Sequence, residues 1–186
     1  MGKNRLEAFS DGVLAIIITI MVLELKQPDG DKLNDLLTLW PTMLSYFVSF
    51  LFISVYWVNH HLLFQKTEKI NLKILWCNLL WLFVMSFVPF ATSWVGKYPQ
   101  SFMPICHYFV LMFMAGITFR FMYHLIQREN NQVPKMRVQS IISLCVYIVA
   151  AAVGGFCPLA AFVLVIVVTI WWIFSIRIRD KQKSNK

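Results

Sequence analysis

Charged and polar side chains stand where the first apolar segment of this 186-residue chain begins. Arg5, Ser10 and Asp11 come directly before an apolar run that starts at Val13. Ionisable groups at or inside a membrane span are energetically costly, so they mark functional sites more often than plain anchors. We therefore expect the first span to carry the functional chemistry of the chain.

One face of this span carries an apolar stripe with a single hydroxyl. Its central residues follow the i, i+3, i+4, i+7 spacing of one helical face, and two further residues extend the stripe toward the N-terminus. The stripe consists of Phe9, Gly12, Ile16, Thr19, Ile20 and Leu23. Contact with lipid or with a neighbouring helix is the usual role of such a stripe, and lining of a pore is the alternative.

Asp11 lies on a different face of the same helix, about 140° from Ile16 at 100° per residue. We therefore expect Asp11 to point into the helix bundle, where a carboxylate needs hydrogen-bond donors. Arg5, near the same level, is expected to pair with an acidic or carbonyl group. The candidate partners at this depth are Ser10, Asn59, His60, His61 and Asn78. Such a network, in which we also include Phe9 and Gly12, would hold the first span in position.

The histidines raise the alternative of a metal or haem protein. His60 and His61 are adjacent, so on a helix they diverge by about 100° and are poorly placed to chelate one ion. No spacing of His, Cys, Asp and Glu matches a structural metal site, and no nucleophile motif, phosphate-binding glycine loop or H-E-x-x-H sequence is present. We expect no resident metal, no cofactor and no enzymatic activity, although a haem held between histidines of facing helices stays open.

The composition is that of an integral membrane protein. Hydrophobic residues make up 59% of the chain and charged residues 14%, against about 25% charged residues in soluble domains. The net charge of +8 could suit a nucleic-acid partner. The basic residues lie between hydrophobic spans and not in one stripe, so we expect no nucleic-acid partner and attribute the charge to orientation in the bilayer.

Six helices are long or apolar enough to be predicted as spans, since a helix needs about 20 apolar residues to cross the bilayer. Their expected ranges are 7–25, 39–63, 71–95, 104–127, 138–154 and 157–176. With both termini in the cytoplasm, only three of the 17 lysines and arginines would face outward, Lys26, Lys32 and Lys97. We therefore expect one all-α domain over residues 1–186, with both ends inside.

Three stretches of the sequence resemble one family. Arg5-x-x-x-Phe9-Ser10-Asp11-Gly12 resembles the RxxxFSDG signature of the prokaryotic relatives of the endolysosomal potassium channel. The segments 56–64, at the end of the second span, and 86–92, in the third, are similar to the same family. The resemblance covers the whole chain as one six-span unit.

The resemblance implies a homotetramer in the bacterial inner membrane, with four copies of the first span lining a central pore. It implies passive, potassium-preferring cation conduction, open to other monovalent cations, through a constriction formed by Ile16, Thr19, Ile20 and Leu23. It places Arg5, Ser10, Asp11 and one of His60 and His61 in a supporting network, without deciding between the two histidines.

Three alternatives remain from the residues alone. A secondary transporter would use Asp11 as an intramembrane carboxylate, usually within broken helices or an inverted repeat, and no repeat is visible in the sequence. A haem or metal membrane protein would use the histidines. A scaffold subunit would carry out no transport.

Overall fold

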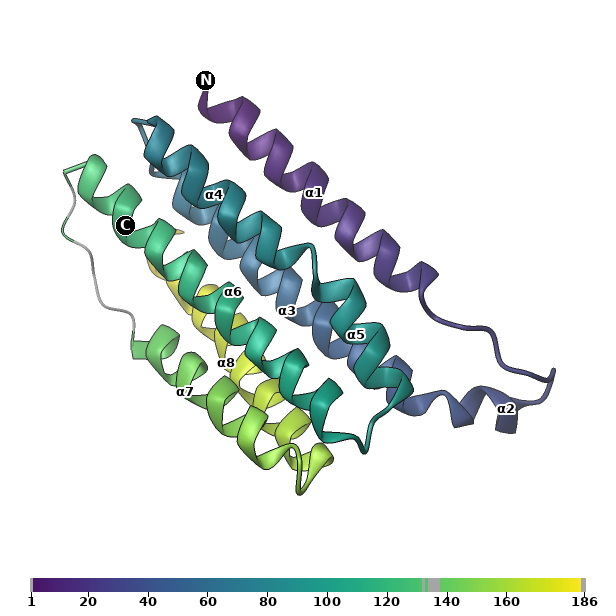
Figure 1. Ribbon diagram of the computed structural model, residues 1–186. Coiled ribbons are helices and arrows are strands. Elements are labelled where there is room, and N and C mark those ends of the chain that lie inside the picture. The colour runs from purple at the N-terminus through teal and green to yellow at the C-terminus, as the bar shows by residue number, and fades with distance from the viewer. Residues whose placement is uncertain (1, 132, 134–137, 185–186) are drawn as a thin grey trace.

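Helices make up nearly the whole of the computed structural model, which describes residues 2–131, 133 and 138–184, the side chains of 176–184 excepted. The elements are α1 (Lys3–Leu23), α2 (Leu33–Thr38), α3 (Trp40–Gln65), α4 (Leu72–Met85), α5 (Val88–Lys97), α6 (Phe102–Glu129), α7 (Val138–Val153) and α8 (Pro158–Ser184) (Figure 1). The prediction of an all-α membrane protein is confirmed.

Five segments of the described chain are long and apolar enough to cross a membrane. They are α1, α3, the stretch Leu72–Lys97 that contains α4 and α5, α6, and residues Pro158–Ser175 of α8. The fifth predicted span corresponds to α7, which is apolar but has 16 residues. A helix of that length rises about 24 Å, less than the roughly 30 Å of a typical hydrocarbon core. The count of six spans therefore stays a prediction that depends on α7.

The third predicted span is not one continuous helix. It is divided at Ser86 and Phe87, between the end of α4 and the start of α5. Pro89 has no N–H to donate to the carbonyl of Met85, and its ring would clash with that carbonyl in a regular helix. The helical hydrogen bonds resume when Ala91 N donates to Phe87 O over 3.1 Å. The segment predicted as the third span therefore consists of two helices, and together they form one stretch, Leu72–Lys97, that is long and apolar enough to cross a membrane.

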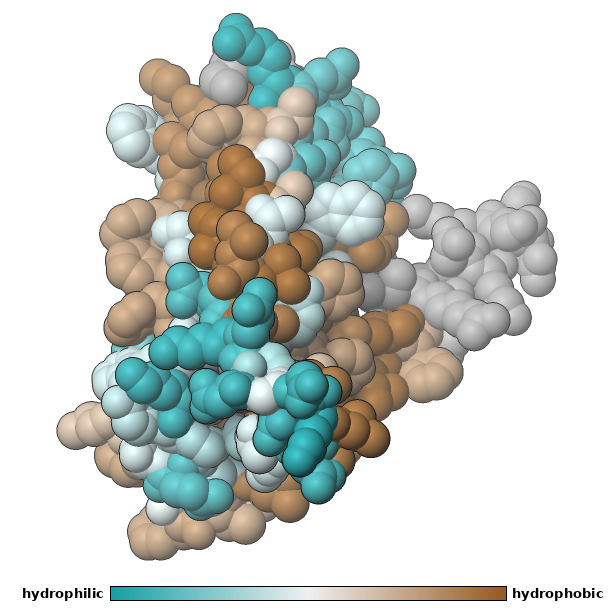
Figure 2. All heavy atoms as spheres, turned by 90° about the vertical axis from the view of Figure 1, so that its right-hand side faces the viewer, coloured by the Kyte–Doolittle hydropathy of each residue, from teal (hydrophilic) through white to brown (hydrophobic). Residues whose placement is uncertain are grey.

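The helices form a bundle in which α1 and α7 lie at opposite edges (Figure 1). Helix α1 contacts α3, α4 and α5, whereas α7 packs against α6 and α8. On the face that lies to the right in Figure 1, apolar side chains occupy a zone between two hydrophilic ends (Figure 2). This distribution fits a protein whose middle lies in hydrocarbon and whose ends lie in water.

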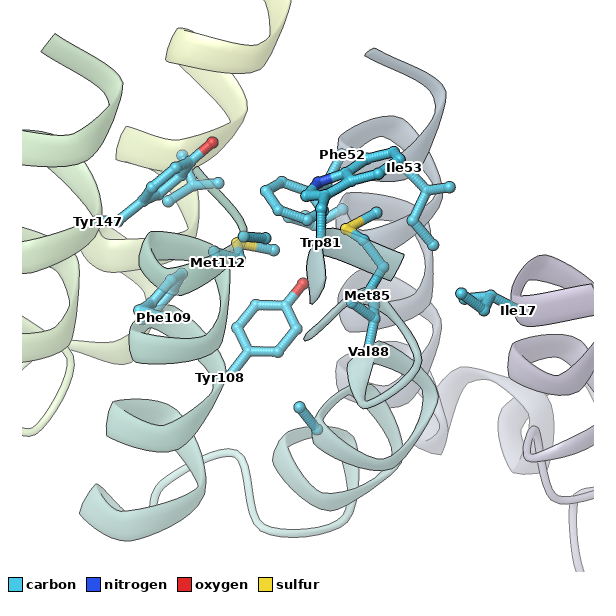
Figure 3. Packing of buried hydrophobic residues seen from close by; sticks show 14 of the residues in the cluster. Ile17, Phe52, Ile53, Trp81, Met85, Val88, Tyr108, Phe109, Met112 and Tyr147 are labelled. Carbon is cyan, nitrogen blue, oxygen red and sulfur yellow. The ribbon is translucent and has the colours of Figure 1, made fainter. Parts of the chain in front are cut away.

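The interior between α3, α4 and α6 is filled by large aromatic and aliphatic side chains. Phe52, Trp81 and Tyr108 are each at most 2% exposed, and Ile17 reaches toward them from α1 (Figure 3). Lipid tails are as apolar as these side chains, so close packing and buried hydrogen bonds, more than exclusion of water, hold membrane helices together. The position of α1 therefore depends on the groups that it contacts in α3, α4 and α5.

Candidate functional site

Helix α1 has one face packed into the bundle and one face that the subunit leaves open. The packed face is formed by Leu6, Ser10, Leu14, Ile17 and Met21. The stripe singled out in the sequence lies on the other face, where Ile16 is 58% and Leu23 81% exposed and where Phe9, Gly12, Thr19 and Ile20 are exposed as well. The residues that the structure describes leave most of this stripe uncovered.

The single hydroxyl in the stripe is already engaged as a donor. Thr19 Oγ1 donates to the carbonyl oxygen of Ile16 over 2.8 Å, within the same helix. A threonine hydroxyl has one proton and two lone pairs. With the proton directed to the backbone, the exposed oxygen of Thr19 presents lone pairs outward, which suits it to accept hydrogen bonds or to coordinate a cation.

A groove of about 730 Å³ runs between α1 and α5 beside the stripe. Val13, Ile16 and Ile20 line it from α1, and Phe90 and Trp94 line it from α5. Its far end is polar, because Ser93 Oγ donates to Glu24 Oε2 over 3.2 Å. This α1–α5 groove is mostly apolar, open along its length and wide enough for side chains of another helix.

A buried hydrogen-bonded network connects the N-terminal half of α1 to α3 and α4. Asn78 Nδ2 donates to Ser10 Oγ over 2.9 Å, and Ser10 Oγ donates in turn to the carbonyl of Leu6 over 2.9 Å. His60 Nε2 lies 2.9 Å from Asn78 Oδ1, which can only accept, so this nitrogen carries the proton. Ser10, His60 and Asn78 are each at most 1% exposed. The structure thus brings together three of the predicted network residues.

The structure distinguishes the two adjacent histidines. The ring of His60 stacks on Trp81 with centroids 5.2 Å apart and an interplanar angle of 14°, which fixes its orientation beside Asn78. His61 is exposed, and its Nε2 lies 3.0 Å from Gln65 Nε2 on its own helix. Because adjacent helical residues diverge by about 100°, only one of the pair can face the bundle.

Asp11 is not part of the buried network, and the expectation that it points into the bundle is wrong for the subunit. Its side chain is exposed, and Trp57 Nε1 donates to Asp11 Oδ1 over 2.9 Å. The reason is helical phase, since Leu6, Ser10 and Leu14 form the packed face at intervals of four and Asp11 follows Ser10 by one residue. Trp57 was not among the predicted partners of Asp11, although an indole N–H is a suitable donor for a carboxylate.

Asn59 and Arg5 are the two remaining residues of the predicted network. Asn59 is buried, and its Nδ2 donates to the carbonyl of Val55 on the same helix over 2.8 Å. Arg5 is exposed. Among the residues that the structure describes, no three His, Cys, Asp or Glu side chains lie close enough to hold a metal ion.

A second polar cluster, which was not predicted, lies beside the C-terminal half of α1. Ser49 Oγ lies 2.7 Å from both Thr92 Oγ1 and Tyr108 OH, which joins α3 to α5 and α6. Thr92 Oγ1 donates to the carbonyl of Val88 over 2.7 Å and lies 3.8 Å from the sulfur of Met21 on α1. The available signal was Ser45 and Ser49, two hydroxyls one turn apart in an otherwise apolar segment.

The same region of the chain matches a known family. The family model described as endosomal/lysosomal potassium channel TMEM175 matches residues 5–89, a range that includes the stripe on α1 and the Ser10, His60 and Asn78 network. The chain is also similar to a crystal structure of a lysosomal potassium-selective channel TMEM175 homolog from Chamaesiphon minutus. The TM-score is 0.79 and the identity 29%, over 93% of this chain and 97% of that one.

Relatives of known class agree with this match. A potassium channel of Chryseobacterium sp. (strain P1-3) is 41% identical over 192 residues, which cover 100% of both chains. A potassium channel of Streptomyces collinus is 40% identical over 52% of this chain and 48% of its own length. The human endosomal/lysosomal proton channel TMEM175 is 33% identical over 54% of this chain and 23% of its own. The chain therefore belongs to the TMEM175 family, whose members are ion channels and not enzymes.

Proposed function

We propose that this chain forms a homotetrameric, potassium-preferring cation channel whose central pore is lined by four copies of α1. The observation that carries the proposal is the open face of α1, on which Ile16, Thr19, Ile20 and Leu23 stand exposed in the subunit. The bacterial relatives named above are potassium channels by name. If four subunits surround one axis, the exposed face of α1 is directed toward the pore, whereas a single subunit leaves this face uncovered.

The α1–α5 groove supports assembly around that axis. A closed ring requires each subunit to offer one surface that its neighbour fills, and the groove lies directly beside the stripe, lined by Phe90 and Trp94. A Cβ added at Gly12 would meet no atom within 4 Å in the subunit. Packing within one subunit therefore does not require glycine at position 12. The missing side chain leaves room for a neighbouring subunit or for the pore.

Conduction through such a pore would depend on whether water fills its narrow apolar part. A narrow ring of Ile16, Ile20 and Leu23 side chains excludes water, and a cation cannot cross without its hydration shell or a substitute for it. The outward lone pairs of Thr19 would replace part of that shell. The sequence contains no T-V-G-Y-G segment, so a filter of backbone carbonyls is not part of the proposal.

The two polar clusters would act as supports for the pore helix. The Ser10, His60 and Asn78 network holds the N-terminal half, and the contact of Thr92 with Met21 holds the C-terminal half. Arg5, Asp11 and Asn59 complete the N-terminal end, where Trp57 fixes the Asp11 carboxylate. We further propose that both termini face the cytoplasm of a bacterial cell membrane, because only three of the 17 basic residues would then face outward.

The test is ion flux into liposomes that contain the purified chain. A potassium gradient should drive flux without any second ion or added energy source, and an equal sodium gradient should drive less. A transporter would instead require the coupled ion on one side. Because the vertebrate relatives are named proton channels, a pH-sensitive dye in parallel vesicles reports proton flux. Flux carried by protons alone, or no flux at all, would contradict the proposal.

Thr19→Val should alter the preference for potassium over sodium. Valine keeps the shape of threonine and removes the oxygen that faces outward on α1. We expect the permeability ratio to change while the total cation flux remains measurable, as determined from reversal potentials in mixed salts. Thr118→Val is the matched control, because Thr118 is buried in α6 and donates to a carbonyl of its own helix. Equal reversal potentials for Thr19→Val and wild type would exclude the role of the hydroxyl.

A further inference from the structure

An arginine within α6, Arg120, has no acidic partner among the side chains that the structure describes. Arg120 lies nine residues before the end of α6 at Glu129, which is about 14 Å along the helix axis. An arginine at such a depth in a span is costly, and in known spans it faces polar groups and marks a site. The ion pair that the structure shows joins Lys73 to Glu129. Among the residues whose side chains are described, no carboxylate pairs with Arg120.

Arg120 lines a pocket between α3, α6, α7 and α8. The pocket has a volume of about 40 Å³, and its lining residues include the hydroxyl-bearing Tyr56, Tyr123 and Ser140. A single water needs roughly 10–15 Å³ on this measure. The space is therefore several times larger than one water needs and suits a compact group with several oxygen atoms.

The chain keeps this pocket open by the absence of a side chain. A Cβ added at Gly116 would lie 3.2 Å from the hydroxyl of Tyr56 and 2.8 Å from Leu144 Cδ2. A second small pocket, of about 30 Å³, shares Tyr56, Gly116 and Trp172 with the first and continues the polar lining into the bundle. There Trp172 Nε1 donates to Ser143 Oγ over 2.8 Å.

The chemistry of the lining selects an anion. A guanidinium offers a planar fork of N–H donors that matches phosphate and carboxylate oxygens, and tyrosine and serine hydroxyls add single donors. The described side chains that line the pocket include no carboxylate, which would repel such a ligand. A phosphate group would supply the negative charge that Arg120 lacks.

The location favours a phosphate group that reaches the pocket from the lipid-facing edge of the bundle. Helices α7 and α8 lie at the edge of the bundle opposite α1 (Figure 1), so the pocket is remote from the proposed pore. Phe121, next in the chain after Arg120, is 59% exposed, as expected of a side chain that touches lipid. The end of α6 toward which Arg120 lies carries Arg128 and is the end that we propose faces the cytoplasm. Basic pockets between helices on that side bind anionic headgroups in other membrane proteins.

We propose that the pocket around Arg120 binds a phosphate group, and that its position at the lipid-facing edge of the bundle assigns this phosphate to the headgroup of an anionic phospholipid. The guanidinium of Arg120 carries the interaction, and the hydroxyl of Tyr56 contributes a further donor. The site is independent of whether α1 lines the pore, because it shares no residue with the stripe or with the α1–α5 groove.

Native mass spectrometry of the purified full-length chain tests the site. The protein is titrated separately with phosphatidylglycerol, phosphatidylcholine and inorganic phosphate, and the occupancy of each is compared. We expect tighter retention of phosphatidylglycerol than of phosphatidylcholine. Arg120→Gln should weaken that retention by about tenfold or more, since a hydrogen-bonded charge is lost. Arg120→Lys should keep part of the affinity, and Tyr56→Phe should lose less than Arg120→Gln.

Arg128→Gln is the matched control, because it removes the same charge from the exposed last turn of the same helix. Equal loss in Arg128→Gln and Arg120→Gln would overturn the site in favour of general surface charge, as would wild-type binding by Arg120→Gln. A third outcome is that inorganic phosphate saturates the site, that Arg120→Gln loses this binding, and that the lipid is not preferred. This outcome would support phosphate binding at Arg120 and assign the ligand to a soluble anion in place of a lipid. Because the readout is binding, a channel without measurable flux would leave the result intact.

Discussion

Asn78→Leu should lower the apparent melting temperature of the purified protein by about 5–10 °C. The substitution leaves the His60 N–H without an acceptor and Ser10 Oγ without a donor, both in a buried site. An unsatisfied buried group costs about 1–3 kcal/mol, and 1 kcal/mol shifts the melting temperature of a domain of this size by about 2–4 °C. Heating followed by size-exclusion chromatography at a fixed rate measures the effect, because membrane proteins unfold irreversibly.

His60→Phe should be destabilising for the same reason, and the double variant with Asn78→Leu should lose less than the sum of the two single losses. Replacing both partners by apolar groups removes the unsatisfied atoms together with the hydrogen bond. His61→Phe is the matched control on the neighbouring exposed position, and it should leave the melting temperature nearly unchanged. Additive losses, or equal effects at positions 60 and 61, would count against the network.

Ile16→Ala and Leu23→Ala should each raise the resting cation flux several-fold and reduce the discrimination between potassium and sodium. Both side chains stand on the open face of α1, and shortening them widens an apolar ring so that water can enter it. Flux in liposomes under opposed potassium and sodium gradients measures the change. The effect depends on the proposed arrangement of four α1 helices around one axis.

Matched controls exist on helices remote from α1. Ile148 on α7 is 53% exposed and Leu159 on α8 is 60% exposed, so their replacement by alanine removes the same groups from surfaces that we expect to face lipid. These variants should conduct as the wild type does. If Ile16→Ala and Leu23→Ala conduct like their controls, the stripe does not line the conduction path.

The stripe on α1 could be predicted from the sequence because helical periodicity identifies a face directly. The interval of four that places Ser10 with Leu6 and Leu14 was equally available, and it would have identified Ser10 rather than Asp11 as the buried residue. The prediction for Asp11 used its angle of about 140° from Ile16, which separates Asp11 from the stripe but does not place it on the packed face. Asp11 lies close enough to the end of α1 for Trp57 to satisfy it at the surface of the subunit.

Other features required the tertiary arrangement. The spacing of these residues in the sequence did not show that the imidazole of His60, on α3, would contact two residues of α4. It stacks on the indole of Trp81 and donates to the amide oxygen of Asn78. The cluster of Ser49, Thr92 and Tyr108 depends on three helices that meet at one level. The interruption of the third span was predictable, because Pro89 stands inside an apolar run too long for an uninterrupted helix to tolerate it.

The same proline divides the scaffold that holds α1 into two helices, α4 and α5. The N-terminal half of α1 is bonded to Asn78 on α4, and the C-terminal half rests on Thr92 of α5, with no continuous backbone ladder between these two residues. Substitutions on one side of the break are therefore poorly transmitted to the other. Evolution could therefore alter the contacts at the C-terminal half of α1 while the N-terminal half keeps its register, so the two halves are free to diverge at different rates.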